Sequence, residues 1–351
     1  MDQIKKILII RFRQVGDSVL TLPLCSSLKR TFPEAEIHLV LNEGLSSLYF
    51  NHPDVDKVIT FSRMQNKSFL LYLQTVWSIT HINNYDVIID MRSTIRTLIF
   101  SLCSLKTPYR IGLLKPYTSF FLNYRISFKD KNNLLNRVKQ NLMLASPLQK
   151  ILPIKYSNEF SLYLSEEEKM IYRQYMQNMG ICFKYPIMLV GVTTKLNNKR
   201  WPKDYMTQII KYVLSDFPEM QLIFNYTPGE EEQDAREIYA DLGCPSAVKI
   251  DIKASNLREL MALCANSSFY FGNEGGARHI AQAMGLSSYG IFSLRYPKTK
   301  WLPVNSVVAY GISPQDCAPT RMLKRATNKK AFEFVTPKLV YQELYCLLRK
   351  I

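Results

Sequence analysis

Apolar and polar positions in the first 112 residues follow two alternating periods. Short apolar runs, such as KILIIRF at 6–12 and EIHLVLN at 36–42, have the length of buried strands. Longer segments between such runs, for example 17–33 and 68–83, repeat their apolar positions with helical spacing. Strands separated by helices of this length predict βαβ units, and therefore an open α/β sheet with parallel strands.

The same alternation begins again in the second half of the chain. Residues 113–185 interrupt it with an aromatic and basic stretch, a predicted helix near 134–146, and a helix opened by the capping box of Ser165 and Glu168. From residue 186 onward, strand-like and helix-like segments alternate once more. The pattern predicts an N-terminal Rossmann-like domain over 1–165, a C-terminal Rossmann-like domain over 183–335 and a C-terminal helix over 336–351. One option for this helix is to pack back on the N-terminal domain.

Composition and cysteine usage narrow the class of protein. Hydrophobic residues make up 47% of the 351 residues and charged residues 21%, which is typical of a packed protein and not of a disordered chain. No run approaches the roughly 18–20 apolar residues that a membrane span needs. The seven cysteines show no CxxC spacing, which indicates reduced thiols in a cytoplasmic protein and argues against a zinc site.

The chain is strongly basic, and its charge is uneven. The formal net charge is +16, and residues 1–150 hold 20 Lys and Arg against 10 Asp and Glu. Such an excess favours an acidic partner, which can be nucleic acid, anionic lipid headgroups or a phosphorylated substrate. A basic surface that only aids solubility explains the charge equally well.

The stretch FGNEGGARHIAQAMG at 271–285 places a carboxylate, two glycines and a histidine where a strand passes into a helix. Helix N-termini offer free N–H groups and the positive end of a dipole, and glycines let a phosphate approach the backbone closely. Glu274, Gly275, Gly276 and His279 therefore indicate an anion-binding turn. A tight structural turn is the alternative, and His279 fits a hydrogen-bonded structural histidine as well as it fits a ligand contact.

Two further strand-to-helix turns in the second half carry polar residues. In GVTTKLNNKRWP, Thr193 and Thr194 can donate hydrogen bonds to a diphosphate, and Lys199 can neutralise it. After the strand QLIFNY, Glu230 or one of the two glutamates that follow it can reach a ribose, although such carboxylates also stabilise the N-terminus of their own helix. Ligands of open α/β sheets bind beyond the carboxyl ends of the strands, so we expect these turns to share one site.

The first strand-to-helix turn, RFRQVGDSVLTLP, contains Gly16 and Asp17. A carboxylate at this place can act as a base that takes a proton from a substrate hydroxyl, and an aspartate is also a standard helix N-cap. Asp54 and Asp56 have the DxD spacing of some metal–diphosphate sites, but they precede a strand, and we interpret them as a solvated turn. We predict no metal site, and the fingerprints GxxxxGKS/T and GxGxxG of P-loop and dinucleotide-binding folds are absent.

Together these segments resemble glycosyltransferase family 9, the heptosyltransferase family of lipopolysaccharide core assembly, over essentially the whole chain. The segments that carry the resemblance are GDSVLTLPLCSSLKRTFPEAEIHLV, DMRSTIRTLIF with the later RIG, TTKLNNKRWP and NEGGARHIAQAMG. The resemblance implies an α/β GT-B fold, in which two Rossmann-like domains with parallel sheets face an interdomain cleft. It also implies an inverting, metal-independent transfer that needs no cofactor. The donor would be a nucleotide sugar, typically ADP-heptose, held by the C-terminal domain.

The resemblance assigns roles position by position. Asp17 falls on the general base, Lys199 on the lysine that meets the donor diphosphate, and Glu274 on an aspartate that contacts sugar hydroxyls. Glu274 is one methylene longer than that aspartate, and Gly275 replaces a hydroxyl residue. The full donor-binding set is Thr193, Thr194, Lys199, Glu230, Glu274, Gly275, Gly276 and His279. The acceptor-binding set is Arg13, Arg92 and Arg96, of which the resemblance carries Arg96.

The sequence therefore predicts a cytoplasmic glycosyltransferase that moves a sugar, heptose in the first instance, to an anionic lipopolysaccharide or lipooligosaccharide core acceptor. Peripheral contact with the cytoplasmic face of the inner membrane is compatible with this prediction. A GT-B-like transferase or epimerase that uses another nucleotide sugar is the alternative within enzymes. A nucleic-acid-binding protein would also explain the charge, but it would group its basic residues on one helix or stripe, and here they are spread through strands and loops.

Overall fold

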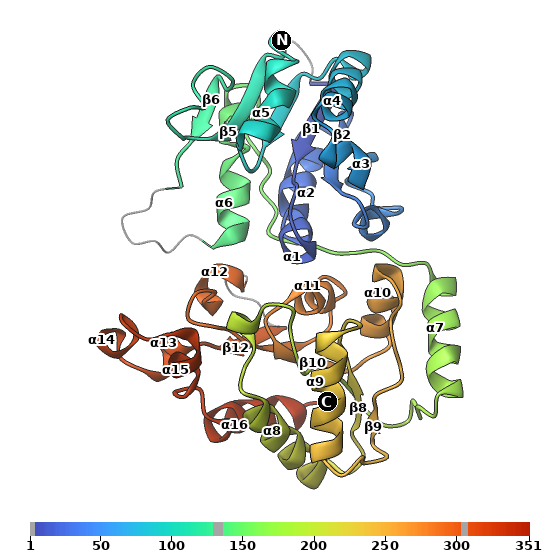
Figure 1. Cartoon of the computed structure of the whole chain (residues 1–351). Helices are drawn as coiled ribbons and strands as arrows, with labels where there is room; N and C mark the ends of the chain where they lie inside the picture. Colours follow the sequence, from blue (N-terminus) through green and yellow to red (C-terminus); the bar gives the residue numbers. More distant parts are fainter. Residues whose placement is uncertain (1–3, 129–135, 303–307) are drawn as a thin grey trace. The chain divides into compact units, whose positions relative to one another are not determined.

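The structure, a computed structural model, describes residues 4–128, 136–302 and 308–351 and divides the chain into two units, Met1–Tyr163 and Leu164–Ile351. Each unit is built around one six-stranded sheet whose paired strands are all parallel (Figure 1). The predicted α/β class, with two parallel sheets, is confirmed by these strand pairings. Residues 134 and 135 of the helix predicted near 134–146 lie outside the described residues.

The sheet of the first unit has the strand order β3-β2-β1-β4-β5-β6. The chain first moves outward from β1 to β3 and then returns to place β4 directly beside β1, so the order reverses between these two strands. The strands are β1 (Lys6–Ile10), β2 (Glu36–Asn42), β3 (Lys57–Phe61), β4 (Val87–Asp90), β5 (Tyr109–Leu113) and β6 (Tyr124–Ile126).

Helices α4 and α5 cover one face of this sheet. Tyr72 and Val76 of α4 and Phe100 of α5 pack in a buried cluster with Leu8 and Ile88 of the sheet. Elsewhere in the unit, α2 packs against α6. The helices are α1 (Val15–Val19), α2 (Leu22–Thr31), η1 (Ser46–Tyr49), α3 (Arg63–Lys67), α4 (Phe69–Asn83), α5 (Ile95–Leu102), α6 (Arg137–Met143) and η2 (Ser146–Lys150).

The sheet of the second unit repeats the same topology, with the strand order β12-β11-β10-β7-β8-β9 and a reversal between β7 and β10. Its core joins Met188 and Val190 of β7 to Ile209 and Ile210 of α8. The strands are β7 (Ile187–Gly191), β8 (Gln221–Phe224), β9 (Val248–Lys249), β10 (Phe269–Asn273), β11 (Ser288–Ile291) and β12 (Ala309–Ile312). The helices are α7 (Glu166–Asn178), η3 (Asn197–Lys199), α8 (Lys203–Asp216), α9 (Glu230–Asp241), α10 (Leu257–Ala265), α11 (Gly276–Ala283), α12 (Lys298–Trp301), α13 (Pro314–Cys317), α14 (Thr320–Leu323), α15 (Asn328–Phe332) and α16 (Pro337–Leu348).

Helix α7, which the domain prediction left between the two domains, belongs to the second unit. It begins with the predicted capping box, because Ser165 and Glu168 bond to each other's backbone N–H groups. Glu168 also accepts a 2.5 Å bond from Arg258 of α10, and the Tyr172 hydroxyl donates to the carbonyl of Lys253 at 3.1 Å. These contacts tie the helix to the second sheet's helical layer.

The C-terminal helix, α16, also belongs to the second unit and not, as one option had it, to the N-terminal domain. Val340, Leu344 and Leu348 recur every four residues and join the hydrophobic core of the second unit. The Tyr341 hydroxyl donates to the carbonyl of Tyr212 on α8 at 3.2 Å. The apolar side of α16 therefore packs against α8. Within the described part of the chain, no helix combines the length and apolar character needed to cross a membrane.

Candidate active site

The turns predicted to bind the donor lie at the reversal point of the second sheet. Strands β7 and β10 pair in parallel there, and the turn with Lys199 follows β7 while the turn with Glu274 follows β10. Crevices beyond strand ends at such reversal points are where open α/β sheets bind ligands. The structure thus brings the two turns together as expected.

A row of glycines crosses the second sheet beside these turns. Gly191, Gly272, Gly290 and Gly311 occupy the same register on β7, β10, β11 and β12. A Cβ atom on Gly272 would overlap the backbone of Gly191, and a Cβ atom on Gly290 would lie 2.7 Å from Cδ of Arg278. The missing side chains therefore let the strands and the Arg278 side chain approach closely at the end of the sheet.

Asn273, the last residue of β10, joins the two turns. Its Nδ2 donates to the carbonyls of Gly191 and Val192 at 3.0 Å each, and its Oδ1 accepts from the backbone N–H of Trp201 at 2.8 Å. The side chain is buried, with 1% of its surface exposed. Asn273 was not among the predicted site residues, because its one signal in the sequence is a polar side chain at the end of an apolar strand.

Glu274 and Arg278 form a buried ion pair at the start of α11. Nε of Arg278 donates to Oε2 of Glu274 at 2.5 Å, and the two side chains are 0% and 1% exposed. The other carboxylate oxygen lies 2.9 Å from Nε2 of His279. Arg278 also donates to Gln282 at 3.0 Å and to the carbonyl of Trp301 at 3.3 Å. The carboxylate is thus held on both oxygens from inside the protein.

The charges of this cluster follow from burial and pairing. Burial by itself would raise the pKa of Glu274, but the Arg278 guanidinium, helped by His279 and Lys199, holds that pKa well below its usual range. Burial and the same guanidinium lower the pKa of His279, so its imidazole is neutral near neutral pH. Glu274 is therefore ionised, and the neutral ring of His279 donates to it from Nε2.

These contacts give Glu274 and His279 bonding partners within the protein, which the sequence predicted, as one alternative, for His279 alone. His279 is a buried, hydrogen-bonded histidine whose ring also meets the Trp301 ring at 5.9 Å, as the structural alternative proposed. The contact of Glu274 with sugar hydroxyls stays a prediction. Arg278 was missed, although Glu274, Arg278 and Gln282 recur at the four-residue spacing that places side chains on one face of a helix.

The N-terminus of α11 has backbone N–H groups without a side-chain cap, as the glycine-containing turn predicted. Gly275 is the N-cap residue, and no side chain caps the helix there. A Cβ atom on Gly275 would lie 3.6 Å from Oγ1 of Thr194, so the Thr194 hydroxyl stands beside this terminus. Backbone N–H groups and a hydroxyl at one helix N-terminus are suited to bind a phosphate oxygen.

Lys199 lies on the 3₁₀ turn η3, against two aromatic rings. Its Nζ is 3.9 Å from the ring centre of Tyr296 and 5.5 Å from that of Trp301. The same charge lowers the pKa of both Glu274 and His279, which places the ammonium group near that pair. The two aromatic residues were not predicted, because nothing in the sequence marks them as neighbours of a lysine about a hundred residues earlier.

Thr193 and Glu230 have partners within the protein. The Thr193 hydroxyl is buried and donates to Asp234 of α9 at 3.4 Å. Arg200 pairs with Asp234 and, at 3.4 Å, with Glu230 at the first position of α9. Arg200 thereby links the turn after β7 to the start of α9. The contact of Glu230 with a ribose stays a prediction.

In the first unit, Asp17 lies near the ends of β1 and β4, where that sheet reverses. Its Oδ1 accepts a 2.6 Å bond from the buried Arg11, and Nε of Arg13 lies 4.0 Å from Oδ2. The alternative that Asp17 caps a helix is wrong, because α1 begins at Val15 and Gln14 is its N-cap residue. Asp17 instead stands inside the first turn of α1, with 15% of its side chain exposed.

Arg92 joins this cluster from the loop after β4. It donates to the carbonyl of Phe12 at 2.7 Å, and burial together with the like charge of Arg13 lowers its pKa. Burial lowers the pKa of Arg11 to about 10, so Arg11 is still a cation at neutral pH. Arg11 and Arg13 thus lie beside the Asp17 carboxylate, and Arg92 is close enough to interact with its charge. The excess positive charge suits an anionic ligand.

Arg96, the third residue of the predicted acceptor set, points to different neighbours. It lies on α5, donates to Oδ1 of Asn66 on α3 at 3.1 Å, and covers the Tyr72 ring of α4 at 4.2 Å. The structure therefore groups Arg13 and Arg92 with Asp17 and ties Arg96 to α3 and α4.

The DxD aspartates hold the backbone and α2 in place before β3. Ser26 of α2 donates to Asp54, and Asp56 accepts from the backbone N–H of Ile37 at 2.7 Å and from Lys29 at 3.1 Å. These bonds agree with the interpretation as a turn. Among the described residues, no group of three or more His, Cys, Asp or Glu side chains is placed to hold a metal ion.

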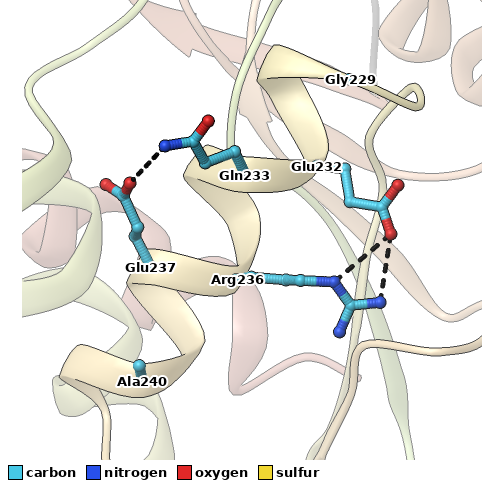
Figure 2. Close-up of a pocket in the computed structure, with 6 residues that line it drawn as sticks. All are labelled: Gly229, Glu232, Gln233, Arg236, Glu237 and Ala240. Carbon is cyan, nitrogen blue, oxygen red and sulfur yellow. Dashed lines mark hydrogen bonds and ion pairs between the residues drawn. The ribbon is translucent and has the colours of Figure 1, made fainter.

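A shallow hollow runs along the outer side of α9 (Figure 2). Its side chains are paired with one another, since Arg236 bonds to Glu232 at 3.1 Å and Gln233 to Glu237 at 3.1 Å. The lining residues are Gly229, Glu232, Gln233, Arg236, Glu237 and Ala240. Of the residues considered for the site, Glu232, one of the three glutamates named for a ribose contact, lines this hollow, but it is paired with Arg236 and Lys253. We therefore assign the hollow no part in the site.

Comparison with known proteins agrees with this arrangement. The family model for glycosyltransferase family 9 (heptosyltransferase) matches residues 79–330. Lipopolysaccharide heptosyltransferase 1 of Campylobacter coli is 23% identical over 295 residues, which cover 82% of this chain and 83% of that protein.

Solved structures show the same fold. The glycosyltransferase family 9 crystal structure from Veillonella parvula has a TM-score of 0.84 at 16% identity and covers 100% of this chain and 99% of its own. The E. coli heptosyltransferase WaaC, solved with ADP-2-deoxy-2-fluoro heptose, has a TM-score of 0.65 at 16% identity and covers 94% of this chain and 98% of its own. The predicted GT-B fold, with two Rossmann-like domains and parallel sheets, is confirmed.

Proposed function

Because this chain belongs to glycosyltransferase family 9, the heptosyltransferase family, we propose that it transfers heptose from an ADP-heptose-like donor to an anionic lipopolysaccharide or lipooligosaccharide core acceptor. The observation that supports the proposal is that each sheet has polar residues at the point where its strand order reverses. In the second unit these are Lys199 and the N-terminus of α11, and in the first unit Asp17 lies there among arginines. The first suits a diphosphate and the second suits a hydroxyl on an anionic acceptor.

In this proposal the second unit stabilises the leaving group. As the bond between the anomeric carbon and the donor phosphate breaks, negative charge develops on the diphosphate. The N–H groups at the start of α11, the Thr194 hydroxyl and the Lys199 ammonium are preorganised to receive that charge. These groups replace the positive charge that a metal ion would supply, so we propose a metal-independent transfer.

The first unit supplies the base in this proposal. Asp17 takes the proton of the acceptor hydroxyl, and the freed oxygen attacks the anomeric carbon from the side opposite the diphosphate, which inverts the configuration. Arg11 orients the carboxylate through its 2.6 Å bond. Arg13 and Arg92 hold the negative charges of the acceptor. The donor and the acceptor must be bound at the same time for this step, at the cytoplasmic face of the membrane that carries the acceptor.

A thermal-unfolding screen with ADP, UDP, GDP and CMP, run with EDTA present, tests the donor class. A ligand that binds only the native state stabilises it, by about 2.7 kcal/mol at a hundredfold excess over its Kd. We expect ADP to raise the melting temperature most. A larger effect of UDP would favour the alternative of another nucleotide sugar. Stabilisation by ADP that appears only after magnesium or manganese is added would contradict metal independence, and no effect of any nucleotide would contradict the proposal.

A further inference from the structure

The outer face of α4 exposes large apolar side chains without a single charge. The helix sequence FLLYLQTVWSITHIN contains no Asp, Glu, Lys or Arg. Leu70, Trp77 and Ile82 are 71%, 57% and 75% exposed. Because Leu70 and Trp77 are seven residues apart, they lie on the same side of the helix, opposite the buried Tyr72 and Val76. Ile82 lies about a third of a turn further round the exposed surface, near the end of the helix. The exposed polar residues on that side are Gln74, Ser78 and His81, whereas a surface helix normally adds Asp, Glu, Lys or Arg there.

The apolar face extends onto the two helices that pack against α4. Helix α3 and helix α5 both contact α4. Met64 of α3 is 73% exposed and Ile95 of α5 is 77% exposed. Of the twenty-five large apolar side chains that are exposed in the described part of the chain, twelve fall in residues 57–128. Roughly a fifth of the chain thus holds about half of them. We call Met64, Leu70, Trp77, Ile82 and Ile95 the α4 face.

Basic residues border the α4 face. Arg63 and Lys67 are exposed on α3, and Arg96 is exposed on α5. Residues 57–128 hold nine Lys and Arg against two acidic residues, Asp86 and Asp90. Asp90 is fully buried, and Asp86 accepts from the backbone N–H groups at the start of β1. One other carboxylate comes near, since Glu43 accepts from the backbone N–H of Arg63 at 3.0 Å.

We propose that the α4 face binds the surface of a bilayer that contains anionic phospholipids. An apolar helix face with a tryptophan, bordered by lysine and arginine, matches the chemistry of the region between acyl chains and anionic headgroups. A second copy of this chain fits less well, because two basic borders would meet and repel each other. Helices α7 and α9 differ from α4 in this respect, since each of them carries three glutamates in its first turn.

The α4 face lies on the unit that holds the predicted acceptor site. Helix α5 begins at Ile95, three residues after Arg92 of the Asp17 cluster. A bilayer bound to this face would therefore lie on the same unit as the site for a lipid-anchored acceptor. The inference rests on the proposed function for its biological meaning, but the binding to lipid can be measured without donor or acceptor.

The test is co-sedimentation of the full chain with vesicles made of phosphatidylcholine and phosphatidylglycerol, against vesicles of phosphatidylcholine alone. We expect binding to the mixed vesicles that weakens with added salt. The variant Leu70→Ser/Trp77→Ser/Ile82→Ser should bind on the order of tenfold more weakly. The matched control is Met170→Ser/Ile171→Ser, which removes two exposed apolar side chains, 61% and 65% exposed, from α7. The control should bind like the unchanged chain.

Tryptophan emission gives a second readout that does not depend on sedimentation. Trp201 is 1% exposed and Trp301 is partly buried, whereas Trp77 is 57% exposed, so a blue shift on addition of mixed vesicles reports mainly on Trp77. The shift should be absent in Trp77→Ser. Thermal unfolding of each variant confirms that it is folded, which we expect because the replaced side chains are exposed.

The inference is wrong if the unchanged chain does not bind mixed vesicles, or if the triple variant binds them as strongly as the unchanged chain. It is also wrong if the α7 control loses as much binding as the triple variant. A dimer of the unchanged chain that the triple variant turns into a monomer would assign the face to a second copy instead. With an acceptor fragment that lacks its lipid, the triple variant should turn over like the unchanged chain. If neither protein turns over, the proposed function fails while the vesicle result still stands.

Discussion

Nε of Arg278 donates a 2.5 Å hydrogen bond to Oε2 of Glu274, four residues earlier in the chain, and neither side chain has more than 1% of its surface exposed. A charge in such a place is stable only while its partner is present. Arg278→Met should therefore lower the free energy of unfolding by about 3–5 kcal/mol, because the Glu274 carboxylate is left buried and unpaired.

The measurement is urea denaturation of a double-mutant cycle. Glu274→Gln/Arg278→Met should lose less stability than the sum of the two single variants, since it removes both charges at once. Arg321→Met, at an exposed position of α14, is the control and should change stability by no more than about 0.5 kcal/mol. A loss in Arg278→Met no greater than in this control would contradict the account of the pair.

The strands that carry the site could be predicted from the sequence, because buried parallel strands are nearly continuous apolar runs. Helices α12 to α15 were not predicted, since helices of four or five residues are too short to show a period. Strand β12 was not predicted either. Arg278 was missed for a different reason. A charged residue in a helix is normally solvated, and only the packing of α11 against the glycine row shows that this one is buried.

The interpretation of Asp17 as a helix cap failed because the sequence predicts one helix over 17–33. The chain in fact forms α1 and α2, with a break at Leu20 and Thr21, and α1 starts two residues before Asp17. The break places Pro23 at the second position of α2, where a proline costs no backbone hydrogen bond. The turn residues were thus predicted correctly, but not their position within the helix.

Lys199→Ala should weaken ADP binding by about one to two orders of magnitude, because it removes a charge-assisted contact worth roughly 1.5–3 kcal/mol. Titration calorimetry with ADP measures this directly. Lys195→Ala, which removes an equal charge from an exposed position of the same turn, is the control and should bind ADP almost normally. Equal affinities of the Lys199 variant and the unchanged chain would place the diphosphate elsewhere.

Arg13→Ala and Arg92→Ala should each raise the acceptor KM by roughly tenfold, since each removes a charge-assisted contact to the acceptor. Arg96→Ala should have a smaller effect, because its guanidinium is already engaged by Asn66 and Tyr72. The affinity for ADP should stay the same in all three. Arg125→Ala, an exposed arginine on β6, controls for the loss of positive charge. The acceptor site would have to be moved if Arg96→Ala had the largest effect.

The pairing of Glu168 with Arg258 should make stability depend on pH. Arg258, with the capping bonds of Ser165, lowers the pKa of Glu168 to about 2 from its ordinary value of 4.5. A depressed pKa stabilises the fold fully above the ordinary value, and this contribution is lost as the pH falls from about 5 toward 2. The carboxylate is about one-third exposed, so we expect only about 1 kcal/mol.

Urea denaturation of the unchanged chain and of Arg258→Met, followed through the buried Trp201 of the second unit, measures this contribution. The stability difference between the two proteins should be present at pH 7 and should shrink toward pH 2. Lys169→Met, which breaks an exposed pair with Glu166, is the control and should show little pH-dependent difference. A difference for Arg258→Met that is the same at both pH values would contradict the prediction.

The assignment of Asp17 as the base can be separated from its pairing with Arg11. Asp17→Ala leaves the buried Arg11 unpaired, and it should cost about 3–5 kcal/mol of stability. Asp17→Asn keeps an oxygen that accepts from Arg11 but cannot take a proton. It should therefore remain folded, lose less stability than Asp17→Ala, and bind ADP like the unchanged chain.

The most direct test of the mechanism is the turnover number of Asp17→Asn with saturating donor and acceptor, at a temperature where the variant is folded. If Asp17 takes the proton of the acceptor hydroxyl, the turnover number should fall by about 10²- to 10⁴-fold, while the affinity for ADP is unchanged. A turnover number within about threefold of the unchanged chain would contradict this role for Asp17 and with it the proposed mechanism.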